Sequence, residues 1–133
     1  MTTRHASCNC GQLSVTCTGD PVRISMCHCI ACQKRTGSVF GVQARFPRDN
    51  VDIKGRATEF VRIADSGNEV ASYFCPTCGT TLYWQLSGFP NLMAVAVGAL
   101  DEPGFPPPRH SVYERHRHGW AMHPGALAME HLE

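Results

Sequence analysis

Cysteines supply the clearest chemistry in this sequence, because a thiolate can bind soft metal ions, attack electrophiles or be oxidised to a disulfide. There are eight of them, and all lie between residues 8 and 78. They form a C-x-C pair, a lone thiol, a C-x-C-x-x-C run and a C-x-x-C pair, which are Cys8 and Cys10, Cys17, Cys27, Cys29 and Cys32, and Cys75 and Cys78. Such a set is either a disulfide framework or a set of metal thiolates.

The expected compartment and the spacing both favour metal binding. The first residues contain no apolar stretch of signal-peptide length, so we expect a cytoplasmic chain whose thiols stay reduced. Cysteines two or three residues apart can share one metal ion, whereas a disulfide between such close neighbours is strained. The sequence therefore predicts metal thiolates rather than disulfides.

One predicted site is a closed, structural zinc site. Cys75 and Cys78 form a knuckle that supplies two ligands, and Gly79 allows the backbone to turn after them. A structural zinc needs four ligands, and Cys8 and Cys10 can supply the other two, since alternate residues of an extended segment share a face. The alternative is that Cys8 and Cys10 are buried apolar thiols.

The second predicted site has only three thiolates, from Cys27, Cys29 and Cys32. Three protein ligands with an open fourth position are typical of a catalytic zinc, whose last ligand is water, a substrate thiolate or another residue. His28 is the nearest candidate, but in an extended segment it should point away from its neighbours and act as a supporting residue. An iron–sulfur cluster is the weaker alternative, because the run matches neither common ferredoxin spacing.

Short blocks of apolar or alternating residues between Gly, Pro and Asn predict a mainly β fold in one domain, residues 1–133. One short helical turn is expected over residues 30–35, ended by Gly37, and turns are expected at residues 65–68 and 87–91. The proline-rich segment 105–108 should be extended on the surface. Strands are predicted over residues 12–18, 22–26, 39–46, 51–54, 58–63, 70–74, 81–86, 92–97 and 110–112.

Composition excludes several classes of function. Hydrophobic residues are 43% and charged residues 17% of the 133, which indicates a compact domain rather than disorder. The formal net charge is +1, so neither a nucleic-acid partner nor a polybasic membrane anchor is expected. The longest apolar run, residues 92–100, is too short to span a bilayer. The oligomeric state stays open.

The motifs together resemble one family. In order along the chain they are C-x-C-G, C-H-C-x-x-C-Q-K-R-T-G, F-C-P-T-C-G-T-T-L-Y, V-G-A-L-D and P-R-H-S-V-Y. Over about residues 5–122 the sequence is similar to the glutathione-dependent formaldehyde-activating enzyme family, whose domain is shared with centromere protein V. The resemblance implies a zinc-containing β-tent of packed antiparallel sheets and a carbon–sulfur lyase that makes S-(hydroxymethyl)glutathione from glutathione and formaldehyde. It also implies a structural zinc on Cys8, Cys10, Cys75 and Cys78 and a labile zinc on Cys27, Cys29 and Cys32.

Other residues are candidates for substrate contacts. Lys34 and Arg35 could hold the two carboxylates of glutathione or form a solvated helix end, and His110, which matches a family histidine, could transfer a proton or be structural. Three aromatic residues could line a pocket, although core packing is the simpler expectation, and two histidines are expected in a solvated basic loop: Tyr83, Trp84 and Phe89, and His116 and His118. Cys17 is expected to be a packed thiol.

Two alternatives to the synthase function remain open. The chain could be a non-catalytic zinc-binding module, or a related lyase acting on another thiol or electrophile. The fourth ligand of the three-cysteine metal separates them: an exchangeable ligand supports chemistry, and a fourth protein side chain supports a structural role.

Overall fold

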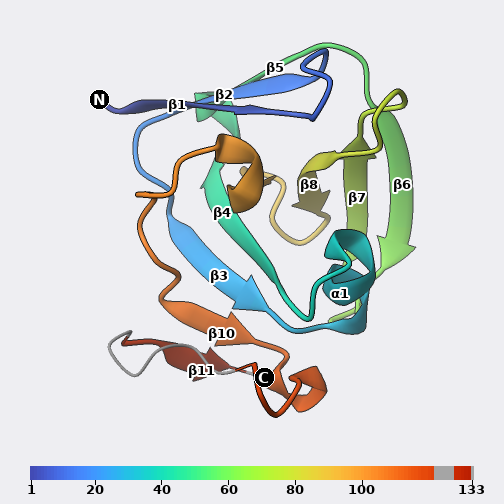
Figure 1. Ribbon diagram of the computed structural model, residues 1–133, viewed down its shortest axis with the longest axis vertical. Helices are drawn as coiled ribbons and strands as arrows, with labels where there is room; N and C mark the ends of the chain where they lie inside the picture. Colours follow the sequence, from blue (N-terminus) through green and yellow to red (C-terminus); the bar gives the residue numbers. More distant parts are fainter. Residues whose placement is uncertain (122–127, 133) are drawn as a thin grey trace.

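The computed structural model describes residues 1–121 and 128–132 as two β-sheets with one α-helix (Figure 1). The smaller sheet has three strands in the order β1-β2-β5, and the larger has eight in the order β11-β10-β3-β4-β9-β8-β7-β6. Neighbouring strands are antiparallel except that β10 runs parallel to β3 and to β11. The predicted mainly β architecture of antiparallel sheets is therefore confirmed.

Strand bounds follow the apolar pattern closely. The strands are β1 Thr3–Ser7, β2 Ser14–Thr18, β3 Arg23–Cys27, β4 Gly41–Pro47, β5 Val51–Lys54, β6 Thr58–Ile63, β7 Glu69–Phe74, β8 Thr81–Leu86, β9 Leu92–Ala96, β10 His110–Val112 and β11 Glu130–Leu132. Short 3₁₀ turns are η1 Arg48–Asn50, η2 Val97–Leu100 and η3 Glu114–His116. Strands β1 and β11 were not predicted, because their sequences TRHAS and EHL contain one apolar residue each and show no apolar alternation.

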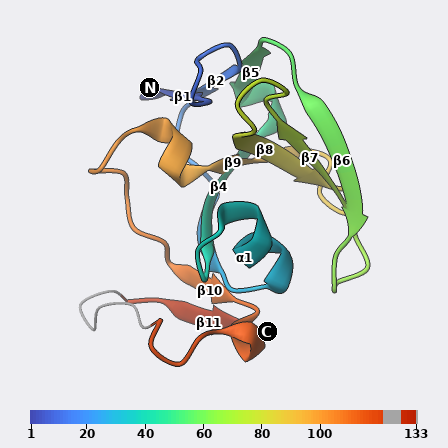
Figure 2. The same ribbon diagram turned by 45° about the vertical axis from the view of Figure 1, so that its right-hand side comes forward.

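The α-helix of the described residues, α1 Ile30–Thr36, follows the predicted turn and ends before Gly37, as the sequence predicts. It begins at Cys29, whose sulfur accepts a hydrogen bond from the backbone N–H of Cys32. It ends at Gly37, which has φ 73°, a left-handed conformation that glycine adopts without strain. In Figure 2 the helix lies within the curve of the eight-stranded sheet, and it contacts β4.

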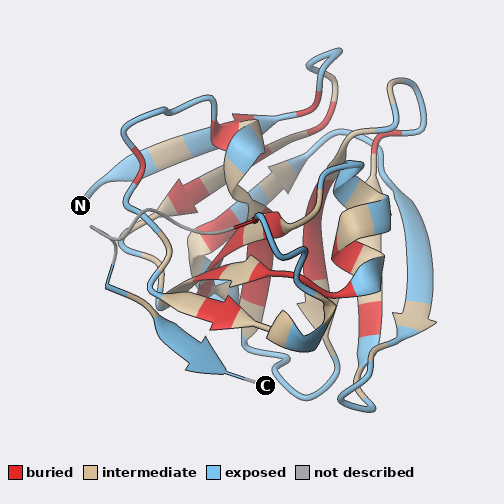
Figure 3. Ribbon diagram, turned by 60° about the horizontal axis from the view of Figure 1, so that its bottom comes forward, coloured by how far each residue is buried: buried red, intermediate tan, exposed pale blue. Residues whose placement is uncertain are grey.

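Buried residues lie on strands of both sheets (Figure 3), and the apolar ones among them make the main core. Among its fully buried members are Leu13, Phe46 and Leu82. Cys17 is also fully buried there, and burial raises the pKa of its thiol to about 11, so it packs as an apolar residue.

The proline-rich segment is only partly the surface segment that was expected. Pro106 and Pro107 are exposed, but Phe105 is buried in the core. The guanidinium carbon of Arg4 lies 4.9 Å from the centroid of the Phe105 ring. The expectation is therefore wrong for Phe105, because one aromatic ring can anchor an otherwise extended segment.

In the part of the chain that the structure describes, no helix is both long enough and apolar enough to cross a membrane.

Gly55 lies in the segment that connects β5 to β6, where the backbone passes close to the loop before β2. Its φ is +102°, and a Cβ there would overlap the carbonyl oxygen of Gln12 and lie 2.9 Å from the Cα of Leu13. We expect Gly55→Ala to lower the free energy of unfolding by about 3 kcal/mol, since backbone atoms must move. Denaturant unfolding measures this loss.

Gly67→Ala is the matched control for that substitution. Gly67 also has a positive φ, +91°, but no atom lies within 4 Å of the added Cβ. This variant should lose only about 1 kcal/mol, from backbone strain alone. Equal losses in the two variants would contradict the close approach at Gly55.

Candidate functional site

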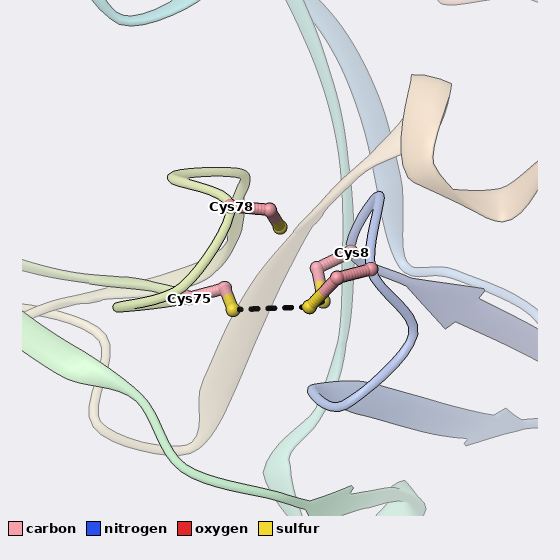
Figure 4. A group of neighbouring side chains, drawn as sticks. Cys8, Cys75 and Cys78 are labelled. Carbon is pink, nitrogen blue, oxygen red and sulfur yellow. Dashed lines mark hydrogen bonds between the residues drawn. The ribbon is translucent and has the colours of Figure 1, made fainter.

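Two loops bring four cysteines together at one end of the small sheet. Cys8 and Cys10 lie between β1 and β2, and Cys75 and Cys78 lie between β7 and β8; Figure 4 shows Cys75 and Cys78 facing the loop of Cys8. All four sulfurs lie within 4.8 Å of one another, with 3.6 Å from Cys8 to Cys10 and 3.7 Å from Cys10 to Cys75. Sulfurs bound to a tetrahedral zinc at about 2.3 Å are about 3.8 Å apart, so this group has the size of a four-thiolate metal site.

Backbone and side-chain groups donate hydrogen bonds to the sulfurs of this group, and the pKa is lowered at Cys75 and Cys78 but raised at Cys10. The backbone N–H of Leu13 donates to Cys8 over 3.3 Å, and the side-chain amide of Gln12 donates to Cys75 over 2.9 Å. Hydrogen bonds from the side chain and then the backbone of Thr80 lower the pKa of Cys78 to about 5. The sequence pattern did not reveal Gln12, because it is not a ligand and its partner is 63 residues away.

Three further cysteines meet where β3 passes into α1. Cys27 ends the strand, Cys29 caps the helix and Cys32 lies in its first turn; all three are buried and their sulfurs lie within 4.8 Å of one another. Hydrogen bonds from the thiols of Cys27 and Cys32 lower the pKa of Cys29. The hydrogen bonds of Cys27 to Cys29 and Cys32 raise the pKa of Cys27. No fourth His, Cys, Asp or Glu joins this group among the described residues. The group can therefore offer three sulfur ligands and leave a position open.

His28 lies between two of these cysteines in sequence but is not part of their group. Its ring is fully buried, and Nε2 lies 3.1 Å from the hydroxyl of Ser111, which donates to Glu114 over 3.0 Å. The alternation of side chains in an extended segment predicts that His28 points away from Cys27 and Cys29. His28 thus connects the end of β3 to β10 through Ser111.

A cavity of about 270 Å³, lined by both polar and apolar side chains, opens beside the three cysteines. Its walls come from β3, α1, β4, β6, β7, β8 and β10, and from the segments that follow β6 and β10. Besides Cys27, Cys29 and Cys32, the polar side chains on these walls are Gln43, Arg45, Arg62, Asp65, Ser66, Tyr113 and His116. We name this cavity the first pocket.

A second pocket of about 370 Å³ adjoins the first. The two pockets share Ala31, Cys32, Arg62, Val70 and Trp84, so both reach the three-cysteine group. The remaining walls of the second pocket are Lys34, Arg35, Phe60, Ser72, Phe74 and Thr81.

Three arginines that line the two pockets form no ion pair with a carboxylate of the described residues. Arg35 lies over the ring of Trp84 at 4.1 Å, and its Nη2 is buried without a hydrogen-bond partner in the described part of the chain. Arg45 lies over the ring of Phe89 at 5.3 Å, and burial lowers the pKa of its guanidinium. Neither of these nor Arg62 forms an ion pair with any described residue. Such guanidinium groups are suited to bind an anionic ligand.

The other sequence candidates divide between the pockets and the surroundings. Lys34 and Arg35 line the second pocket, whereas His110 lines neither and has its Nε2 3.3 Å from Glu130. His116, expected in a solvated loop, instead lines the first pocket, and His118 lies 3.0 Å from the side-chain oxygen of Gln33. The side chain of His116 is 32% exposed, so the expectation of a solvated loop holds only in part, and Gln33 of α1 donates to the backbone carbonyl of His116 over 3.1 Å.

The three aromatic candidates also separate. Tyr83 is buried in the core and stacks on Tyr73 at 4.8 Å, as core packing predicts. Trp84 is buried and at the same time lines both pockets, and Phe89 is half exposed under Arg45. Core packing and pocket lining are thus combined at Trp84.

The pocket residues that the sequence pattern missed are Gln43, Arg45, Arg62 and Tyr113. They lie on three different elements or loops, and no local spacing links them to a cysteine. Only the strand order places β4, β6 and β10 around α1.

The fold and the site define a mainly β domain with one group of four and one group of three cysteines, each of which could hold a metal ion. The family model of the glutathione-dependent formaldehyde-activating enzyme matches residues 3–116, and the chain therefore belongs to this family.

Relatives that carry the family name are distant. A Penicillium rubens protein is 28% identical over 74% of this chain and 58% of its own length. An Aspergillus flavus protein is 26% identical over 90% of this chain and 65% of its own length. The chain thus spans about three fifths of the length of these curated relatives. A Rhodobacter sphaeroides protein of known crystal structure superposes with a TM-score of 0.58 at 20% identity, covering 77% of this chain and 91% of that one, which supports the fold alone.

Proposed function

We propose that the chain is a zinc-dependent carbon–sulfur lyase of the cytoplasm that joins glutathione to formaldehyde. The observation that carries the proposal is the three-cysteine group, which can leave a ligand position open towards a pocket lined by arginines. Family membership supports the two reactants, since the family is named for both.

The donor sets fit two zinc ions per chain. Thiolates are soft ligands that zinc binds readily, with four in closed structural sites and three in sites that keep a position for chemistry. Cys8, Cys10, Cys75 and Cys78 would hold the structural zinc, and Cys27, Cys29 and Cys32 the catalytic zinc. When bound, zinc supplies Lewis acidity, which lowers the pKa of a neighbouring thiol from its usual value of about 8.5.

Charged side chains around the pockets would orient glutathione, which has two carboxylates and one ammonium group. Arg45 and Arg62 in the first pocket would bind one carboxylate, while Lys34 and Arg35 at the second pocket would bind the other. Asp65, already 3.1 Å from Arg115, would accept the ammonium group. This arrangement holds the thiol at the cysteine group.

The addition itself needs one bond and one proton. The sulfur of glutathione forms a bond to the carbonyl carbon, the π electrons move to oxygen, and the proton released by the thiol is returned to that oxygen. His116 lines the first pocket and would hold this proton, and the neighbouring Tyr113 hydroxyl would bind the oxygen. His110 lies outside both pockets, so we assign it a structural role in β10.

Exchange spectroscopy of the glutathione–formaldehyde equilibrium tests the function. Thiols add to formaldehyde without a catalyst, so binding alone does not demonstrate catalysis. We expect the zinc-loaded protein to raise the exchange rate about a hundredfold over buffer. The metal-free protein at the same concentration is the control, and an unchanged rate with the loaded protein would leave a non-catalytic zinc-binding module as the better description.

A further inference from the structure

The second pocket differs in chemistry from the first, although both reach Cys32. Its largest side chains are apolar, namely Phe60, Phe74, Val70 and the ring of Trp84, and the cations of Lys34, Arg35 and Arg62 lie beside them. Val70 is 3% and Trp84 is 6% exposed, so two of these walls belong to a packed apolar cluster.

The hollow is created by one small residue. In the strand register, Ser72 of β7 stands between Phe60 of β6 and Trp84 of β8. Side chains at directly opposed positions lie on the same face of a sheet, so a serine between two aromatic residues leaves a gap with aromatic sides. A larger side chain at Ser72 would fill it.

Phe60 shows that this apolar wall is incomplete in the free protein. Its side chain is 58% exposed on β6, which is an edge strand of the large sheet. Phe60 and Arg62 lie on the same face of that strand, and both line the second pocket. A ligand with an apolar body would cover the ring of Phe60 and gain from removing it from water.

Neither reactant of the proposed reaction has such a body. Formaldehyde has one carbon, and glutathione presents amides, two carboxylates and an ammonium group, which suit the charged and polar side chains of the two pockets. The cations beside the second pocket would bind a carboxylate, but its aromatic sides have no partner in either molecule. The apolar volume is therefore available to an electrophile larger than formaldehyde.

We propose that the second pocket binds the apolar body of a larger aldehyde, with an aryl ring or a short branched chain, whose carbonyl carbon lies at Cys32. The inference rests on the proposed function, because the same thiol addition takes place: the sulfur–carbon bond forms, and the thiol proton goes to the former carbonyl oxygen. The product is a hemithioacetal, and no oxidant or reductant is needed.

Exchange spectroscopy with benzaldehyde in place of formaldehyde tests the proposal. The zinc-loaded protein should accelerate exchange of the benzaldehyde hemithioacetal at least as much as that of S-(hydroxymethyl)glutathione, each relative to its rate in buffer. Ser72→Leu should reduce the ratio of the two accelerations about tenfold, since it fills the hollow between Phe60 and Trp84.

Ala71→Leu is the matched control. Ala71 directly precedes Ser72 in β7, and its side chain lies on the other face of the sheet, beside Glu69 and Gln85. It should leave the ratio unchanged. Saturation transfer from the zinc-loaded protein to the ring protons of benzaldehyde, without glutathione, should be lost in Ser72→Leu and kept in Ala71→Leu.

The outcomes separate this inference from the function on which it rests. Acceleration of formaldehyde exchange without acceleration of benzaldehyde exchange would overturn the inference and leave the function in place, as would a ratio that Ser72→Leu does not change. Acceleration with neither aldehyde would overturn both.

Discussion

Cys78→Ser is expected to lower the melting temperature by more than about 10 °C, whereas Cys32→Ser should lower it by less than about 4 °C. Serine is a poor zinc ligand at neutral pH, so either variant should lose the metal at its own site. The two sites differ in what the metal holds together, and this difference makes the effects unequal.

The four-cysteine group connects segments far apart in the chain. Cys10 and Cys75 are 65 residues apart, and their loops belong to the three-stranded and the eight-stranded sheet. A metal there closes a long loop and joins the two sheets, so its binding free energy contributes to folding. Cys27 and Cys32 lie within one strand–helix junction that the backbone already forms, so a metal there adds little constraint.

Thermal unfolding of the two zinc-loaded variants, followed by circular dichroism, measures the difference. Cys17→Ala serves as a control for the loss of a thiol that belongs to neither group. Melting temperatures lowered equally by Cys78→Ser and Cys32→Ser would contradict the division into a structural and a catalytic site.

Cys32→Ser is expected to return the glutathione–formaldehyde exchange rate to its uncatalysed value, a loss of about a hundredfold. Cys32 is the cysteine that lines both pockets, and with only two sulfurs left the group should lose its zinc. Metal analysis after zinc saturation should find two zinc ions per chain in the unsubstituted protein and one in the variant.

Cys17→Ala is again the control, and it should retain two zinc ions and the full acceleration. If the unsubstituted protein binds only one zinc ion per chain under saturating conditions, the proposal of a second zinc site at Cys27, Cys29 and Cys32 is wrong. Full acceleration in Cys32→Ser, with one zinc bound, would show that the chemistry takes place elsewhere on the chain.

The division of the eight cysteines into four, three and one could be predicted from the sequence. Cysteines two or three residues apart can share a metal ion, so the grouping of Cys27, Cys29 and Cys32 follows from local spacing alone. The bounds of β5, β6 and β8 were likewise predicted, because each has a clear apolar pattern between turn residues. The pairing of Cys8 and Cys10 with Cys75 and Cys78 was inferred from a count of ligands, and the structure brings these four together.

The pockets could not be predicted in this way, and only the tertiary structure determined them. Arg45, Arg62 and Trp84 lie on β4, β6 and β8, which are not consecutive along the chain, and the order of strands in the large sheet brings them around α1. The hollow at Ser72 likewise depends on register, since a shift of one residue would turn its side chain to the other face. Local spacing therefore determines which residues can share a metal, and the pairing of distant strands determines what a ligand at that metal would contact.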